Sequence, residues 1–110
     1  MDKQAVIFRL TELPGEIEDR ENDLLDAQEE LNKAKEALID QQNALFESGA
    51  IDGKNAELRF AQMRNLTSKE RAAVAAIETN VAAARINLNR VVNQFKAYRT
   101  VAKLLDQGVE

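Results

Sequence analysis

The sequence contains no cysteine and no histidine. Without cysteine the chain has no disulfide, thiolate metal site or catalytic thiol. The absence of histidine removes the commonest metal ligand and the usual general base at neutral pH. Helical spacing puts Asp19 and Asp23 on one face, where a solvated acidic surface is a better interpretation than a cation site. We therefore expect a protein that is not an enzyme and needs no cofactor or metal.

Proline, glycine and aromatic residues are also scarce. The 110 residues include one proline and four glycines, and 5% are aromatic, whereas 45% are hydrophobic and 31% charged. This composition is typical of amphipathic helices that bury apolar seams. The longest apolar run spans only Ala72 to Ile77, and the N-terminus lacks a basic segment followed by an apolar one. We expect no signal peptide, no membrane span and a location in the cytoplasm.

The first half of the chain carries a heptad repeat. Its apolar positions are Leu10, Ile17, Leu24, Leu31, Leu38 and Leu45. Small residues such as Ala27 and Ala34 follow three residues later, which indicates a helical seam. Pro14 interrupts the repeat, and a proline costs about 3 kcal/mol inside a helix. The sequence therefore predicts a short helix over 3–12 and a long helix over 14–47.

The second half carries an equally regular pattern at alternating spacings of three and four. These positions are Val74, Ile77, Val81, Ala84, Leu88, Val91, Phe95, Tyr98, Ala102 and Leu105. The run from Thr67 to Glu70 has the form of a capping box, so we expect a long helix over 68–106. We predict that the two long helices pack antiparallel and that the numbers of facing residues sum to 115. Leu31 then faces Ala84, which sets a large residue against a small one.

Residues 48–66 lie between the long helices and are called the cap. Gly49 and Gly53 mark a turn, and a short helix over 56–66 should pack Leu58, Phe60, Ala61 and Met63 across the hairpin end. The fold class is thus all-α, a long antiparallel, coiled-coil-like helical hairpin over 1–110. Apolar residues outside the seam predict a homodimer that forms a four-helix bundle. They are Val6, Ile7, Phe8, Leu25, Ile39, Ile86, Val92, Val101 and Leu104.

The charges of the two halves have opposite signs. Residues 1–50 hold 13 acids and 5 bases, whereas residues 51–110 hold 6 acids and 10 bases. We interpret this division as two helices that lie against one another. The alternative is an acidic arm and a basic arm with separate partners.

Residues 52–62 read Asp-Gly-Lys-Asn-Ala-Glu-Leu-Arg-Phe-Ala-Gln. Polar residues near a turn often make interactions because rigid elements hold the loop in place. We predict a partner-binding site made of Lys54, Asn55, Glu57, Arg59 and Gln62. The alternative is that such side chains fasten the cap by hydrogen bonds.

This segment resembles the central Asp-Gly-Lys-Asn-Ala-Glu-x-Arg-x-Ala-Gln motif of small, poorly characterised phage and prophage proteins. In that family the motif lies between a helix rich in Leu and Glu and a second heptad helix that begins near Thr-x-x-Glu, here Thr67 to Glu70. The resemblance implies a phage or prophage origin and the cytoplasm of a host bacterium. It supplies no catalytic residue, and a role in phage DNA metabolism or against a host defence would be association only.

The sequence thus predicts an interaction protein that binds itself and an unidentified protein partner. A nucleic-acid-binding accessory protein is the alternative, with phosphate contacts from bases of the cap and of the last helix. The candidate bases are Lys54, Arg59, Arg64, Arg85, Arg90 and Arg99.

Overall fold

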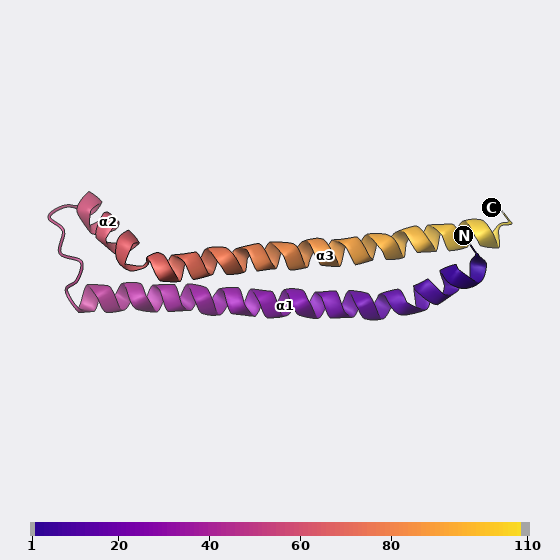
Figure 1. Cartoon of the computed structure of the whole chain (residues 1–110), viewed down its shortest axis with the longest axis horizontal. Helices are drawn as coiled ribbons and strands as arrows, with labels where there is room; N and C mark the ends of the chain where they lie inside the picture. The colour runs from indigo at the N-terminus through magenta and orange to yellow at the C-terminus, as the bar shows by residue number, and fades with distance from the viewer. Residues whose placement is uncertain (1, 109–110) are drawn as a thin grey trace. The chain divides into compact units, whose positions relative to one another are not determined.

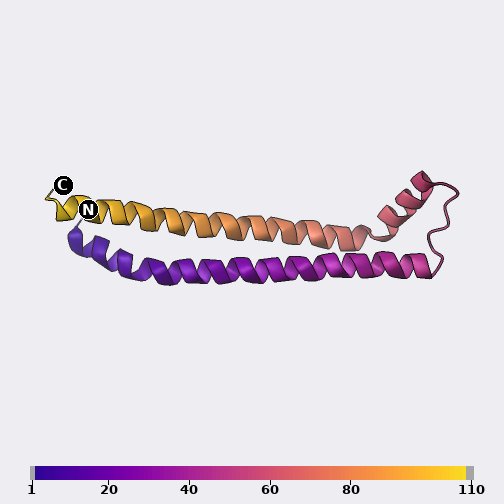
Figure 2. The same cartoon turned by 180° about the vertical axis from the view of Figure 1, so that it is seen from behind.

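The computed structural model describes residues 2–108, and within that range the chain is all-α, as predicted. Its helices are α1 (Lys3–Glu47), α2 (Ala56–Leu66) and α3 (Ser68–Asp106). In each of the two compact units described below, α1 and α3 lie side by side and run in opposite directions, the pairing expected of a helical hairpin (Figures 1 and 2). Within residues 2–108, no helix has an apolar stretch long enough to cross a membrane.

The helices contribute to two compact units. The terminal unit combines the chain up to Asp26 with the chain from Ala82 onward, so it pairs the first part of α1 with the last part of α3. The cap unit comprises Ala27–Val81 and contains the rest of both helices together with α2.

In each unit the helix pair buries the seam that the heptad pattern predicts. In the terminal unit Leu13 is fully buried and Ala84 is 8% exposed, while in the cap unit Val74 and Val81 are buried. The leucines of the heptad, from Leu10 to Leu45, are half-buried. The period of the apolar residues thus identifies the face of each helix that meets its partner.

Pro14 lies inside α1, so the prediction of a separate short helix over 3–12 is wrong. Proline lacks the N–H that would bond the carbonyl four residues earlier, and prolines inside helices usually cause bends. The N-terminal stretch of α1 bends in Figure 1. The fully buried side chains of Val6 and Leu13 anchor the helix before the proline, and the burial of Val6 also removes it from the predicted surplus of surface apolar residues.

The predicted register of the two helices is also wrong. Arg9 Nη2 donates a hydrogen bond to Gln94 Oε1 at 3.0 Å. With facing numbers that sum to 115, Arg9 would lie opposite Asp106, 12 residues or about 18 Å along the axis from Gln94, which is beyond reach. If α3 is shifted by one heptad, the numbers of facing residues sum to 108. Arg9 then lies opposite Arg99, five residues from Gln94 and within reach of it. The terminal unit ends at Asp26 on α1 and begins again at Ala82 on α3, and these two residue numbers also sum to 108.

Candidate partner-binding cap

The cap begins where a glycine ends α1. Gly49 has a φ of +77°, in the left-handed region that favours glycine. Its N–H donates to the Phe46 carbonyl at 3.2 Å, and the Ala50 N–H donates to the Leu45 carbonyl at 3.1 Å. These two bonds form a Schellman motif, which satisfies the last carbonyls of α1 and turns the chain out of the helix.

Gln62 on α2 fastens the loop that follows. Its Oε1 accepts hydrogen bonds from the backbone N–H groups of Asp52 (3.1 Å) and Gly53 (2.8 Å). Its Nε2 donates to Asp52 Oδ1 at 2.6 Å. One side chain therefore satisfies three polar groups of a segment that has no regular structure.

The loop also approaches the backbone of α2 closely at Gly53. A Cβ on Gly53 would lie 2.8 Å from Arg59 N and 2.8 Å from Leu58 Cβ, so no larger residue fits without a shift. The Gly53 carbonyl accepts a hydrogen bond from Arg59 Nη1 at 3.1 Å. Glycine is thus required here for close packing of two chain segments.

Asn55 begins α2 as its N-cap. Its backbone is extended, and Oδ1 accepts a hydrogen bond from the Leu58 N–H at 2.9 Å. Asparagine is among the strongest N-cap residues because its side chain satisfies an orphan donor of the first turn. Hydrogen bonds among Asp52, Gly53, Arg59 and Gln62 join the loop to α2, and Asn55 caps the same helix. We call these five residues the clasp.

The junction between α2 and α3 rests on Thr67, which is 1% exposed. Its hydroxyl donates to the Met63 carbonyl at 2.7 Å and accepts a hydrogen bond from Arg71 Nε at 3.4 Å. Arg71 Nη2 also donates to the Arg64 carbonyl. The predicted capping box is therefore not formed, because the Thr67 hydroxyl serves the last turn of α2 rather than the first amides of α3.

The predicted binding residues divide into two groups. Asn55, Arg59 and Gln62 belong to the clasp, so their polar groups serve the cap itself. Lys54 and Glu57 are exposed, and within residues 2–108 their side chains make no hydrogen bond or ion pair. The hydrogen bonds between Asp52 and Gln62 depend on the path of the loop. The sequence pattern therefore could not predict that these two residues would pair.

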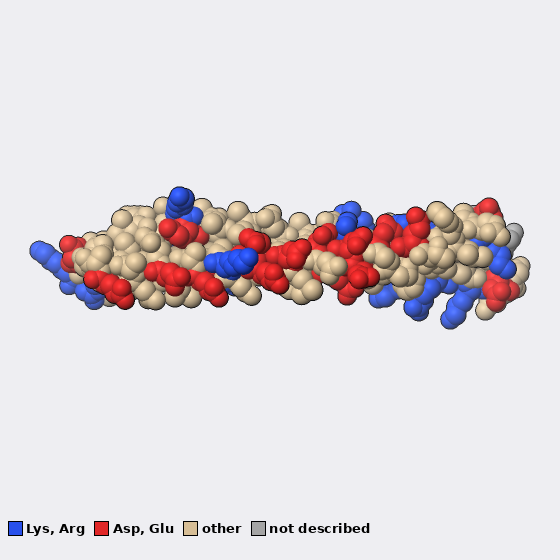
Figure 3. Space-filling model, turned by 90° about the horizontal axis from the view of Figure 1, so that it is seen from below, with Lys and Arg blue, Asp and Glu red and all other residues tan. Residues whose placement is uncertain are grey.

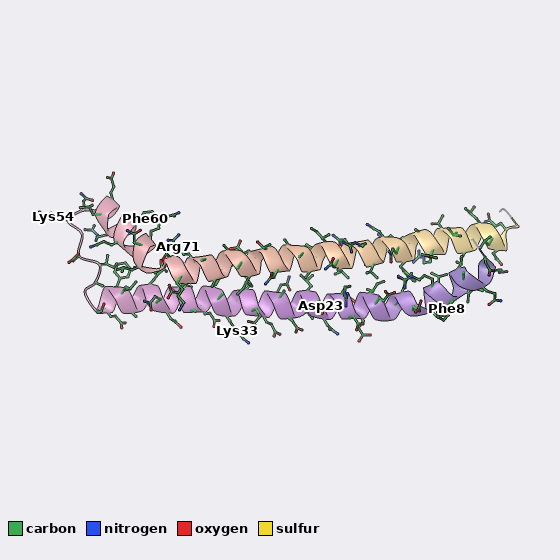
Figure 4. The ribbon with its side chains drawn as sticks, viewed as in Figure 1. Phe8, Asp23, Lys33, Lys54, Phe60 and Arg71 are labelled. Atoms are coloured by element: carbon green, nitrogen blue, oxygen red, sulfur yellow. The ribbon has the colours of Figure 1, made fainter. Side chains whose placement is uncertain are left out.

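The exposed apolar side chains of α2 were missed as candidates. Phe60 is 68% exposed, Leu58 50% and Leu66 48%, and α2 contains no buried residue. The prediction that Leu58 and Phe60 pack across the hairpin end is wrong, whereas Met63 is half-buried. Figure 4 labels Phe60 on α2 and Lys54 in the loop that precedes it. The α2 helix therefore offers both apolar and charged groups for contact.

The five arginines predicted to contact phosphate are divided between the two units. Arg59 and Arg64 belong to the cap unit, whereas Arg85, Arg90 and Arg99 belong to the terminal unit. The guanidinium of Arg99 lies 5.5 Å from the centre of the Phe95 ring, a cation–π distance. Near it, Lys96, Arg99, Thr100 and Lys103 line an open hollow of about 270 Å³ on α3.

The opposite charges of the two halves do not pair across the hairpin. Within residues 2–108 every ion pair lies inside α1: Arg9 with Glu12 and Glu16, Arg20 with Asp23, and Lys33 with Glu30. The hydrogen bond that the Arg9 guanidinium donates to the Glu16 carboxylate raises the pKa of Arg9. The interpretation of the charge division as helix–helix pairing is therefore not supported by the ion pairs of residues 2–108.

Within residues 2–108, no group of three or more acidic side chains is arranged to hold a metal ion. Comparison with known proteins gives no match to a family model, a curated protein or a solved structure.

Proposed function

We propose that this protein is a non-enzymatic interaction protein that associates with itself and presents its cap to a protein partner. The observation that carries the proposal is the exposure of large apolar side chains. Seven such residues lie outside α2 and outside the seam: Ile7, Phe8, Leu25, Ile39, Phe46, Ile86 and Leu104, which are 44–65% exposed. In Figure 4 Phe8 is labelled near the bent end of α1.

The total accessible surface leads to the same proposal. The chain of 12.3 kDa exposes 7947 Å². A folded monomer of this mass exposes about 6,100 Å² on average. Only five apolar residues are buried within residues 2–108. A second copy that covers part of the apolar surface would supply burial that one hairpin lacks, and a four-helix bundle is the arrangement we propose.

The α2 helix supports the proposed partner contact. Isolated helices shorter than about 12–15 residues are marginal in water, and α2 has 11 residues and no buried side chain. The clasp holds it in place by polar contacts, which leaves Leu58, Phe60 and Leu66 exposed. We propose that the partner covers these apolar side chains, with Lys54 and Glu57 at the rim of the contact.

The phage or prophage origin implied by the Asp52–Gln62 motif completes the proposal. On that ground we propose that the protein acts in the cytoplasm of a host bacterium, and prophage-bearing cells are then the source in which to seek its partner.

Self-association is tested by sedimentation velocity in about 0.5 M salt, where exposed charges are largely screened. We expect a dimer for the natural chain and a monomer for Leu25→Ser/Ile86→Ser. The control Asn32→Ser/Asn93→Ser alters exposed polar residues on the same helices and should remain dimeric. A natural chain that stays monomeric at tens of micromolar would refute self-association.

Partner capture is tested by affinity purification from prophage-bearing cells. Phe60→Ser should keep the helicity of the natural chain and lose the partner, because Phe60 has little to pack against within its own chain. The control Lys33→Ser changes an exposed residue of α1. If Phe60→Ser captures the same protein as the natural chain, the α2 surface is not the contact.

A further inference from the structure

The terminal unit carries acidic side chains along one side of α1. Carboxylates recur at spacings of four and three, which keeps them in one stripe beside the seam. We call this stripe the acidic edge: Glu12, Glu16, Asp19, Asp23 and Asp26. Figure 3, which looks onto α1, shows acidic side chains gathered along this helix. Arg9 and Arg20 neutralise some of the charge, but Asp19 and Asp26 are exposed and form no ion pair within residues 2–108.

The same unit carries a basic stripe on α3. Its members lie at spacings of eleven, three and four, which again places them on one side of the helix. We call this stripe the basic edge: Arg85, Lys96, Arg99 and Lys103. No acidic residue occurs between Thr79 and Leu105, and none of these bases forms an ion pair within residues 2–108. Three of them surround the hollow of about 270 Å³.

The two edges lie on opposite sides of the terminal unit. Gln94 bonds Arg9, which in turn binds Glu12 and Glu16, so the Gln94 side of α3 adjoins the acidic edge. At about 100° per residue, Arg99 lies about 140° around α3 from Gln94. The basic edge is therefore on the other side of the seam, which explains why α1 does not neutralise it.

We propose that the acidic edge of one copy docks on the basic edge of a second copy. This inference deepens the self-association proposed above and rests on it. Asp19 and Asp26 are seven residues apart, as are Lys96 and Lys103, so both pairs repeat every 10.5 Å or about two helical turns and can meet in register. Complementary charge of this kind fixes the register and partner of an interface.

The placement of the edges determines what such docking builds. Each contact uses the acidic edge of one copy and the basic edge of the other, and it leaves one edge of each copy free. The contact is therefore heterologous, and it continues to a third copy unless the rotation closes a ring. A nucleic acid would meet the same basic edge, but the chain carries a net charge of −4 and supplies matching carboxylates itself.

Sedimentation velocity at two ionic strengths tests the proposal, with paired charge reversals. The natural chain should form species larger than a dimer in about 0.05 M salt, and these should dissociate in about 0.5 M salt. Lys96→Glu/Lys103→Glu and Asp19→Lys/Asp26→Lys should each weaken this growth by about tenfold or more. An equimolar mixture of the two variants should restore it, because the acidic edges of one then face the basic edges of the other. Lys35→Glu/Lys69→Glu is the control, because it changes the net charge as much as the lysine reversal does but in the cap unit.

The possible outcomes separate the two levels of self-association. A dimer at high salt without growth at low salt overturns the edge docking alone, whereas a monomer under all conditions also overturns the proposed dimer. Growth that survives either reversal, or that the mixture fails to restore, overturns the docking. So does growth that occurs only with added duplex DNA, which would make the basic edge a nucleic-acid site. If circular dichroism shows that a reversal variant is unfolded, Lys96→Gln/Lys103→Gln and Asp19→Asn/Asp26→Asn replace it, and each should also lose growth.

Discussion

Gln62 binds Asp52 at two points, with Oε1 accepting from the Asp52 N–H at 3.1 Å and Nε2 donating to Asp52 Oδ1 at 2.6 Å. An amide suits this position because it both accepts and donates. A carboxylate of the same size would accept only, and it would repel Asp52. The pair ties the loop after α1 to a helix that has no buried side chain.

We expect Gln62→Ala to open the loop locally. It removes three hydrogen bonds that are partly exposed to water, and each contributes about 0.5–1.5 kcal/mol at most. Amide hydrogen exchange at Asp52 and Gly53 should accelerate by about tenfold or more, since both amides lose their acceptor. Glu57→Ala is the control because Glu57 is exposed and its side chain makes no hydrogen bond or ion pair within residues 2–108. Unchanged exchange at both amides would show that Gln62 does not hold the loop.

Gly53→Ala should destabilise the cap unit. The new Cβ would meet Arg59 N and Leu58 Cβ at 2.8 Å, and overpacking of this kind costs about 1–3 kcal/mol. Gly15→Ala is the matched control, because nothing lies within 4 Å of a Cβ there and alanine is the better helix former. Urea titration should therefore show a lower midpoint for Gly53→Ala and an unchanged or higher one for Gly15→Ala. Equal midpoints for the two variants would contradict the close approach at Gly53.

Leu13→Ala should lower the free energy of unfolding by about 2–5 kcal/mol, because Leu13 is fully buried in the terminal unit. Phe8→Ala is the comparison, since Phe8 is larger but 65% exposed. Thermal unfolding followed by circular dichroism separates the two. A larger loss for Phe8→Ala than for Leu13→Ala would mean that the seam does not pass through Leu13.

Arg20 occupies a seam position between Leu13 and Ala27, where its Nε is buried and lies 3.0 Å from Asp23 Oδ2 at an angle unsuited to a hydrogen bond. Arg20→Leu should raise the free energy of unfolding by about 1 kcal/mol, because an apolar side chain fits the seam without desolvating a charge. Asp23→Ala should have the opposite effect, since it leaves the Arg20 charge without its partner. Denaturant titration of both variants at one pH measures the difference.

The sequence predicted the helices better than their alignment. Apolar spacing and the glycines of the turn indicated where α2 and α3 lie, because each helix buries one face with a fixed period. The same period leaves the register undetermined, since a shift of seven residues returns every seam residue to the seam. Only a contact outside the repeat, here between Arg9 and Gln94, distinguishes the two alignments.

Pro14 and the cap illustrate two further limits. The local cost of a proline predicted a helix boundary, but the burial of Val6 and Leu13 anchors a continuous α1. In the cap, the polar residues of the motif were identified as a group. Whether they serve a partner or the fold depends on distances such as that between Asp52 and Gln62, which spacing along the chain does not contain.

The confinement of the ion pairs to α1 has a consequence for how this surface can evolve. No charged residue of α3 within residues 2–108 forms an ion pair. The pairing of α1 with α3 therefore does not require a particular sign of charge at these positions. Substitutions at Lys96 or Lys103 can therefore change what the surface attracts while the apolar seam preserves the fold. In the part of α3 that carries Lys96 and Lys103, the charges and the buried seam are separate sets of residues, and selection can act on one without penalising the other.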